Sequence, residues 1–415
     1  MHLFSVLLLM VAPVLAQKLL IPMDLSQTDH LKAYGVAYWA LERGNTVEWL
    51  LNYRGGSFLT YDGEDLRRVC LIRGVSYEIV DGAETAEIYA TIQNSNMEVV
   101  RLEKAPSIAV YVPPIAEPWD DAVRMALEYA EVPYITLWDR EVLEDQLEEY
   151  DWLHLHHEDF TGQYGKFYAM YHNTPWYRER QRYHEETARS LGFTKVSELK
   201  KAVAFKIREY VRKGGFLFAM CSATDTIDIA LAAAKTDICD TVYDGDPPDP
   251  QAQEKLDFSP TFAFENFHVI LDPYQYEFSD IDVQPYGGVG MGPEAEAFTL
   301  FDFSAKYDPV PTMLVQNHTQ IVKGFLGQTS AFHKRFLKKS VVVLGQVEGT
   351  DEVKYIHGNL GKGTFTFLAG HDPEDYRHRV GDPPTQLSLH KHSPGYRLIL
   401  NNILFPAAEK KERKT

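Results

Sequence analysis

Three short segments of this sequence end predicted strands with side chains suited to acid–base, nucleophilic or metal chemistry. They are Cys221, the run HLHHED at residues 154–159, and the run HDPE at residues 371–374. In a parallel sheet the carboxyl ends of the strands share one edge, and ligands bind at that edge. We therefore expect these segments to meet at one site, although they lie far apart in the chain.

Cys221 is the predicted nucleophile. It follows an apolar strand at residues 216–220 and precedes two small residues and a helix, so its side chain would project above the sheet at a sharp corner. The N-terminus of the helix would favour the thiolate over the thiol. The alternative is structural, because cysteine is among the residues most often buried for packing.

A catalytic thiol needs a general base, and the base needs an orienting acceptor. His371 is the predicted base, and Asp372 or Glu374 the predicted acceptor. The structural alternative is that His371 holds a turn and Glu374 is solvated.

The HLHHED run supports a second hypothesis, a zinc site made by His156, His157 and Glu158. On a strand, His154 and His156 share one face and His157 points to the other, so only a subset of these side chains would converge. The prediction is therefore no cofactor, with zinc as the alternative. His157, Glu158 and Ser222 are predicted to contact the substrate.

The alternation of strand-like and helix-like segments predicts an α/β protein in two units. Residues 17–104 read as βαβαβα, a smaller N-terminal α/β domain with a parallel sheet. Residues 105–406 read as a three-layer domain with a parallel sheet and a long irregular insertion at 236–311, and residues 407–415 read as a separate charged tail. Its strands are predicted at 108–112, 134–138, 152–156, 216–220, 313–316, 340–347, 353–357 and 364–369.

Residues 160–192 are rich in aromatic and basic side chains and predict a further insertion across the top of the sheet. Aromatic rings beside arginines stack a ligand in some proteins. We favour the other interpretation, that these rings pack a long loop.

Charge narrows the choice of partner. The 415 residues carry a net charge of −18, which argues against nucleic acid and against an anionic membrane surface. The partner that remains consistent with this charge is a small-molecule or peptide substrate.

The three cysteines of the sequence are too few for a disulfide scaffold.

Residues 1–16, MHLFSVLLLMVAPVLA, have the pattern of a secretory signal. Their apolar core is too short to span a bilayer, and Val14-Leu15-Ala16 offers a cleavage site before Gln17. This pattern predicts an exported protein, periplasmic or extracellular, that is not inserted in the membrane.

A cysteine at a strand-to-helix corner, followed later by a histidine with a nearby glutamate, resembles the class I glutamine amidotransferase-like (flavodoxin-like) fold. That fold carries Gly-x-Cys-x-Gly and then His-Pro-Glu, where this chain has AMCSA at residues 219–223 and HDPE. The resemblance covers residues 105–406. It implies Cys221 as nucleophile, His371 as base and Glu374 as the third member.

A second resemblance covers nearly the whole chain. The strings KLLIPMDLSQTDHLKAYG, WLLNYRGGSF, DWLHLHHEDFTGQYGKFY, GGFLFAMCSATDT and FLAGHDPEDY are similar to an exported bacterial family commonly labelled asparagine synthetase B. The synthetase's own motifs, a cysteine after the initiator methionine and a Ser-Gly-Gly-x-Asp-Ser loop, are absent here. The combined prediction is an exported amidotransferase-like hydrolase that cleaves a C–N amide or related acyl bond through a cysteine. The alternatives are a non-catalytic ligand-binding protein on the same fold and a divalent-metal-dependent hydrolase.

Overall fold

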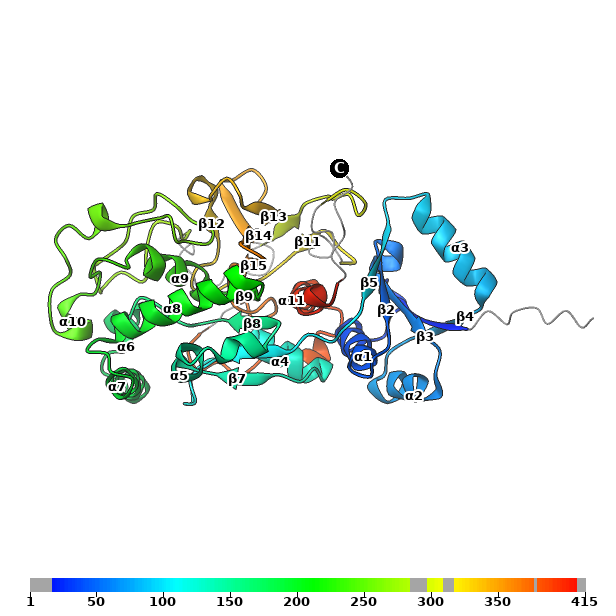
Figure 1. Cartoon of the computed structure of the whole chain (residues 1–415), viewed down its shortest axis with the longest axis horizontal. Coiled ribbons are helices and arrows are strands. Elements are labelled where there is room, and N and C mark those ends of the chain that lie inside the picture. Colours follow the sequence, from blue (N-terminus) through cyan, green and yellow to red (C-terminus); the bar gives the residue numbers. More distant parts are fainter. Residues whose placement is uncertain (1–16, 284–296, 309–316, 377–378, 409–415) are drawn as a thin grey trace, which may run out of the picture.

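The computed structural model describes residues 17–283, 297–308, 317–376 and 379–408. It shows an α/β protein with two sheets, one of ten strands and one of five (Figure 1). The small sheet lies at the right of the view and the large sheet at the left. Helices α1 (His30–Glu42) and α11 (Pro394–Leu404) lie between them.

One half of the large sheet is parallel, in the order β15-β9-β8-β6-β7. These strands are β6 (Ile108–Tyr111), β7 (Ile135–Leu137), β8 (Trp152–Leu155), β9 (Phe216–Met220) and β15 (Gly363–Leu368). The other half continues from β15 in antiparallel fashion. Its strands in order are β14 (Glu352–Leu360), β13 (Val342–Gln346), β10 (Phe298–Leu300) and β11 (Ile321–Val322), and β12 (Phe332–His333) pairs with β14.

The parallel sheet predicted for residues 105–406 is present in only one half of the large sheet. One further expectation for this region changes, and another is not tested. Strand β10 lies inside the segment predicted as an irregular insertion, because Phe298 and Leu300 are buried against the core while Thr299 is half-buried. The strand predicted at residues 313–316 lies outside the described residues.

The parallel strands are buried on both faces, as their nearly continuous apolar sequences require. Along β9, Phe216, Phe218 and Met220 face one core and Leu217 and Ala219 face another. Helices α4 (Ala122–Ala130) and α11 cover the first face, and α8 (Val196–Lys213) and α9 (Ala223–Ala232) cover the second.

The small sheet has the order β4-β1-β3-β2-β5 and is antiparallel throughout. The parallel sheet predicted for residues 17–104 is therefore wrong. Its strands are β1 (Lys18–Ile21), β2 (Val47–Leu51), β3 (Ser57–Tyr61), β4 (Glu78–Val80) and β5 (Glu98–Leu102).

The error arises at a tight turn. Residues 53–55 form a single 3-10 turn in which Arg54 has a left-handed φ of 46°, and Gly55 and Gly56 also have positive φ. This turn folds β3 back on β2 as a hairpin. The sequence interpretation ended the strand there and missed β3, which placed every later strand in the wrong pairing.

The two sheets share one hydrophobic core. It includes Trp49 and Phe58 of the small sheet, Trp152 and Phe218 of the large sheet, and Leu400 of α11. Helix α1 packs against α4 and α11 and is buried on most of its surface.

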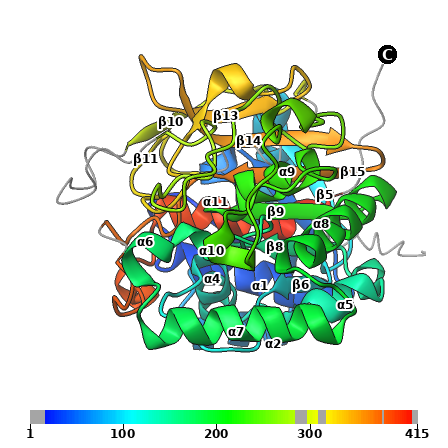
Figure 2. The same ribbon diagram turned by 90° about the vertical axis from the view of Figure 1, so that its left-hand side faces the viewer.

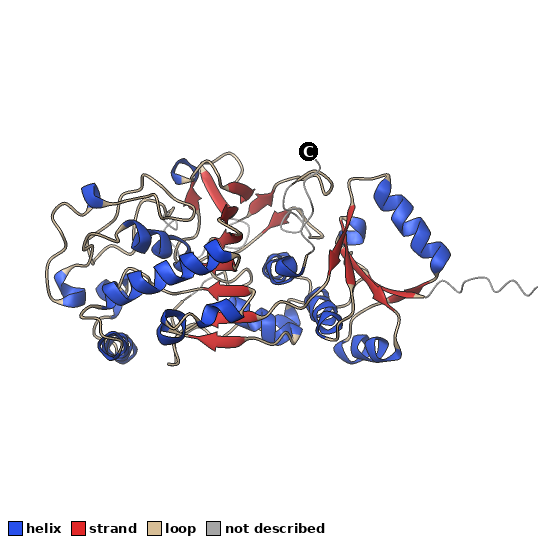
Figure 3. Ribbon diagram, viewed as in Figure 1, coloured by secondary structure: helices blue, strands red, loops and turns tan. Residues whose placement is uncertain are grey.

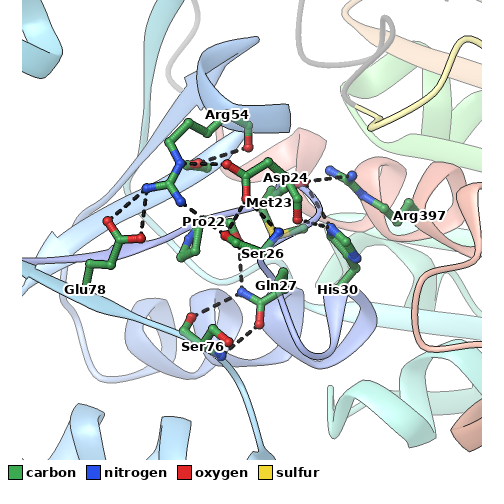
Figure 4. A network of polar contacts seen from close by, with 11 residues as sticks. Pro22, Met23, Asp24, Ser26, Gln27, His30, Arg54, Ser76, Glu78 and Arg397 are labelled. Carbon is green, nitrogen blue, oxygen red and sulfur yellow. Dashed lines mark hydrogen bonds and ion pairs between the residues drawn. The ribbon is translucent and has the colours of Figure 1, made fainter.

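A polar network at the same junction ties the loop after β1 to both units (Figure 4). Arg54 Nε donates to Asp24 Oδ2 (2.7 Å), and its Nη1 donates to Glu78 (2.8 Å). Arg397 of α11 donates to the carbonyl oxygens of Met23 (3.2 Å) and Gly55 (2.7 Å). The Pro-Met-Asp segment after the first strand thus holds the small sheet to the C-terminal helix.

Figure 2 faces the opposite end of the molecule, where α7 (Pro175–Ser190) runs along the lower edge of the view. The aromatic rings of the 160–192 insertion pack on one another and on Trp119, which lies 5.4 Å from Phe167 and 5.6 Å from Trp176. This packing agrees with the interpretation favoured from sequence.

The remaining helices are distributed around the two sheets (Figure 3). They are α2 (Glu64–Arg73), α3 (Gly82–Gln93), α5 (Asp139–Leu143), α6 (Tyr168–Tyr171) and α10 (Thr241–Asp244). Among the helices of the described ranges, none has the length and apolar character needed to cross a membrane.

Candidate functional site

The three chemically interesting segments meet at one edge of the large sheet. Strands β8, β9 and β15 are neighbours and parallel, and they end at Leu155, Met220 and Leu368. Backbone hydrogen bonds join the segments that follow: Cys221 N donates to Gly370 O (3.0 Å) and Ala223 N to His156 O (3.1 Å). The convergence expected from the sequence is present.

Cys221 occupies the corner between β9 and α9 with a left-handed φ of 51°. Its side chain is buried and its sulfur donates to Gln328 O at 3.2 Å. Burial, reinforced by the nearby charges of Asp225 and Asp282, raises the pKa of Cys221 to about 12. The expected stabilisation of the thiolate by the helix N-terminus is thus outweighed by desolvation.

His371 is also buried, and its two ring nitrogens have different partners. Nδ1 lies 2.8 Å from His156 Nε2, and Nε2 lies 2.8 Å from Asp120 Oδ1. The carboxylate beside His371 is therefore Asp120, where the sequence interpretation placed Asp372 or Glu374.

Those two acidic residues have structural partners. Asp372 accepts hydrogen bonds from Glu374 N and from Tyr396 OH, each at 2.7 Å. Glu374 accepts from Tyr376 OH (2.9 Å) and lies 3.1 Å from His390 Nδ1. Their contacts hold the turn after β15.

His156, His157 and His371 form an imidazole cluster. One ring nitrogen from each lies within 4.8 Å of the others, and the His157 ring stacks on that of His156 with centroids 4.0 Å apart. From the sequence, the His157 side chain was expected to point away from that of His156, on the other face of the strand. Strand β8 ends at Leu155, so the two-residue alternation of a strand does not extend to His156 and His157.

The outward-facing nitrogens of these rings are held by oxygen acceptors. His371 Nε2 contacts Asp120 Oδ1, His156 Nδ1 lies 3.0 Å from Asp121 Oδ1, and His157 Nε2 lies 2.8 Å from the backbone oxygen of Asp120. Metal-binding histidines characteristically donate their second N–H to a carboxylate or carbonyl in this way, which fixes the tautomer and the ring orientation. Three imidazoles held in this way could bind one divalent ion, and three histidines are a ligand set used by zinc.

Asp120 and Asp121 were missed by the sequence interpretation. They lie in the loop between β6 and α4, where no periodicity marks them. Asp121 also caps α4 by accepting from Val123 N (2.8 Å) and Arg124 N (3.0 Å). An Asp-Asp pair at a helix start that follows a buried strand is the signal that would have found them.

The other predicted ligands lie apart from the cluster. Glu158 is buried near Glu117 and Arg180, whose charges act on its pKa, and is not part of the three-histidine group. Ser222 is buried, and its carbonyl accepts from Thr226 N (3.1 Å). The zinc site proposed from the sequence consisted of His156, His157 and Glu158. In the structure, His371 takes the place of Glu158 in this group.

Two further groups have metal-ligand spacing in the described residues but are already engaged. His154 and His156 share Asp121, which caps α4, and His154 Nδ1 lies 3.1 Å from Phe218 O. The Asp237, Cys239 and Asp244 group holds the ammonium of Lys195, 2.6 Å from Asp237 and 3.1 Å from Asp244.

No protein-family model matches the chain, and no curated protein matches it in sequence. Solved structures with a similar arrangement include two cytoplasmic proteins of Salmonella typhimurium. STM3548 has 13% identity and a TM-score of 0.34 over 74% of this chain and 100% of its own. STM1381 has 12% identity and a TM-score of 0.34 over 73% and 99%. A beta-galactosidase from Bacillus circulans sp. alkalophilus has 10% identity and a TM-score of 0.27 over 71% of this chain and 32% of its own.

At such TM-scores the similarities say nothing about activity or substrate. Both Salmonella structures are named cytoplasmic proteins, which differs from the exported location expected from residues 1–16 of this chain. Residues 1–16, on which that expectation was based, lie outside the described part of the chain. Export is therefore not retained.

Proposed function

We propose that this protein is a divalent-metal-dependent hydrolase of a C–N amide or related acyl bond. His156, His157 and His371 would bind the ion, and zinc suits three imidazoles best. The observation that supports this most directly is that the three ring nitrogens lie within 4.8 Å of one another at the carboxyl edge of the parallel strands. The proposal includes a three-layer, class I glutamine amidotransferase-like arrangement for residues 105–406, preceded by a smaller α/β domain.

The protein's own groups would prepare the site in two ways. Asp120 and Asp121 would accept the outer N–H groups of His371 and His156, which turns the lone pair of each inner nitrogen toward the ion and holds the ring orientation. A bound zinc ion would lower the pKa of a coordinated water and polarise the substrate carbonyl. Burial of His156 and His371 would keep bulk water away from the reacting bond, which would strengthen these electrostatic effects.

A second candidate is hydrolysis by the Cys221 thiol. The observation that favours it is the left-handed φ of 51° at a strand-to-helix corner, the strained position in which nucleophiles of several hydrolase folds are held. The burial of the thiol and its raised pKa count against it. A non-catalytic binding protein is the remaining alternative.

Metal content and chelation separate these candidates. We expect purified protein to hold about one zinc ion per chain, measured by elemental mass spectrometry, and His156→Ala or His371→Ala to lose it. His268→Ala, at an exposed histidine, is the control. Hydrolysis of an amide and ester library should stop on chelation, return with zinc and survive Cys221→Ser.

The opposite pattern, with Cys221→Ser inactive and chelation silent, would replace the metal mechanism with the thiol mechanism. A protein that binds no divalent ion and hydrolyses nothing in the library would leave the binding protein as the better description.

A further inference from the structure

A cluster of buried polar side chains beside the imidazole cluster takes no part in the chemistry proposed above. Nineteen buried side-chain nitrogen and oxygen atoms in the described residues make no hydrogen bond to protein. Eight of them belong to residues whose contacts and charges link them around Arg180. They belong to Glu117, Trp119, Trp138, Glu158, Arg180 and His184. Buried polar atoms in native proteins are nearly always satisfied, so such a concentration points to a polar partner from outside the chain.

The cluster adjoins the imidazole site through Trp119. The Trp119 ring lies 5.6 Å from that of His157, and Trp119 directly precedes Asp120. On its other side, the Arg180 guanidinium lies over the Trp119 ring at 4.8 Å. A molecule bound beside Arg180 would therefore be one aromatic ring away from the proposed metal ligands.

The charges of the cluster do not balance. Lys200 is neutralised by Asp139, to which it donates at 2.8 and 3.1 Å, and it lies 3.8 Å from the centre of the Trp138 ring. Arg180 Nη1 lies 3.4 Å from Glu117 Oε1, without hydrogen-bond geometry. Glu158 is a second buried carboxyl on which the charge of the same guanidinium acts.

Glu158 has a carboxyl oxygen that no donor of the described protein satisfies. Its Oε2 atom is buried and makes no hydrogen bond. A buried ionised carboxyl is tolerated only when a positive group pairs with it. An ammonium group would pair with Glu158 and supply hydrogens for both carboxyls.

The N–H donors of the cluster that make no hydrogen bond require an acceptor from the ligand. Arg180 Nε and the indole N–H of Trp138 have no protein acceptor, and the indole N–H of Trp119 has only the Glu117 carboxyl nearby. A ligand that carried only an ammonium group would leave these donors unsatisfied. An oxygen near the ammonium nitrogen would accept from them.

We propose that this cluster is a binding subsite for a small primary ammonium compound with an oxygen acceptor next to the amine-bearing carbon. That this subsite belongs to the substrate site of a hydrolase rests on the proposed function. The binding of the ammonium compound itself does not require a metal ion. Glu117, whose side chain is 10% exposed, and the half-buried Trp119 mark the side from which the ligand would enter.

Ligand-observed NMR with four fragments tests the proposal: glycine, ethanolamine, ethylamine and acetate. We expect millimolar binding of glycine or ethanolamine, weaker binding of ethylamine and none of acetate. Preference for glycine would identify a carboxylate as the acceptor, and preference for ethanolamine a hydroxyl. Glu158→Gln and Arg180→Gln should each weaken binding roughly tenfold or more, because each removes a charged hydrogen-bond partner.

Arg182→Gln, at an exposed arginine of the same helix, should bind as the wild type does. Glu117→Gln, at the rim, provides a second variant with little risk to folding, and thermal melting checks all of them. Binding should persist in His371→Ala, which separates this subsite from the metal centre. If no fragment binds, or if binding is the same in wild type, Glu158→Gln and Arg180→Gln, internal water alone satisfies these atoms and the subsite does not exist.

Discussion

At the scale of single residues, the candidate site is defined by what holds each imidazole. His156 and His371 are 215 residues apart in sequence and 2.8 Å apart through their ring nitrogens. Each ring turns its other nitrogen toward a carboxylate from the same short loop, Asp121 for His156 and Asp120 for His371. The orientation of the cluster is thus set by two residues that are not themselves in the three-histidine group.

Asp120→Asn tests this dependence. The amide keeps the size of the side chain but removes the charge that fixes the His371 tautomer, so zinc affinity should fall roughly 10- to 100-fold. Competition with a chromophoric chelator measures the change. Asp145→Asn, at an exposed aspartate paired with Lys206, is the control and should leave affinity unchanged. Equal affinity in wild type and Asp120→Asn would show that Asp120 does not support the metal.

Thiol reactivity tests the role of Cys221. All three cysteines are buried, and burial raises the pKa of Cys70 and of Cys221 to about 12 and that of Cys239 as well. We therefore expect essentially no reaction with Ellman's reagent at pH 8 in the native protein and reaction of all three thiols in guanidinium chloride. A single fast thiol that maps to Cys221 would instead favour the thiol mechanism.

At the scale of elements, the sequence predicts buried parallel strands well and pairings poorly. The apolar runs at 108–112, 152–156, 216–220 and 364–369 coincide with β6, β8, β9 and β15 to within one or two residues. A short apolar run bounded by turns needs no partner to be recognised. The pairing of the small sheet depends on the tight turn at Arg54, whose left-handed conformation no propensity indicates.

The same contrast holds within the site. Cys221, His154–His157 and His371 lie at the ends of predicted strands, so their common edge follows from the topology alone. Asp120 belongs to a loop that approaches the cluster only in the folded protein, and the direction of His157 depends on where β8 ends. Long-range contacts and element boundaries are the two features that local sequence patterns leave open.

The packing of α1 on α4 gives a prediction at this scale. A Cβ at Gly35 would lie 1.7 Å from Ala130 O at the end of α4, so Gly35 allows a backbone approach that no larger residue permits. Gly35→Ala should lower the free energy of unfolding by about 1–3 kcal/mol through overpacking, despite the better helix propensity of alanine. Urea denaturation measures it. The control is Glu42→Ala, at an exposed residue near the end of the same helix, whose free energy of unfolding should stay within about 0.5 kcal/mol of the wild-type value. If the Gly35→Ala protein is as stable as wild type, α1 and α4 can move apart without loss of stability.

At the scale of the whole molecule, the buried Arg397 side chain joins the two sheets. Its hydrogen bonds in the described part of the chain go to groups such as carbonyl oxygens and a histidine rather than to a carboxylate. Arg397 donates to the carbonyls of Met23 and Gly55 and contacts His318 Nδ1 at 3.0 Å. His30 stacks on His318 with ring centroids 4.8 Å apart. Burial and the Arg397 charge lower the pKa of His318 to about 4 and that of His30 to about 3. The junction therefore needs both imidazoles neutral.

This requirement predicts a pH dependence with a definite sign. Between pH 6.5, the ordinary pKa of histidine, and about pH 4, the unfolded chain binds a proton at His318 that the folded chain does not, so stability contributed by His318 is complete above pH 6.5 and is lost as the pH falls. Asp225 and Asp228 act in the opposite direction. Burial raises their pKa values to about 7 and about 6, so the stability that these two groups contribute to the protein is complete below pH 3.8 and is lost as the pH rises.

The contribution of His318 must therefore be measured as the difference in stability between wild type and His318→Gln, in which the glutamine can still accept a hydrogen bond from Arg397. Urea denaturation from pH 7 to pH 4 should show the stability of wild type falling relative to the variant by up to about 1.4 kcal/mol per pH unit, with exposed His268→Gln following the wild type. If the curves of wild type and His318→Gln run parallel, protonation of His318 does not loosen the junction, and Arg397 holds the two sheets together without it.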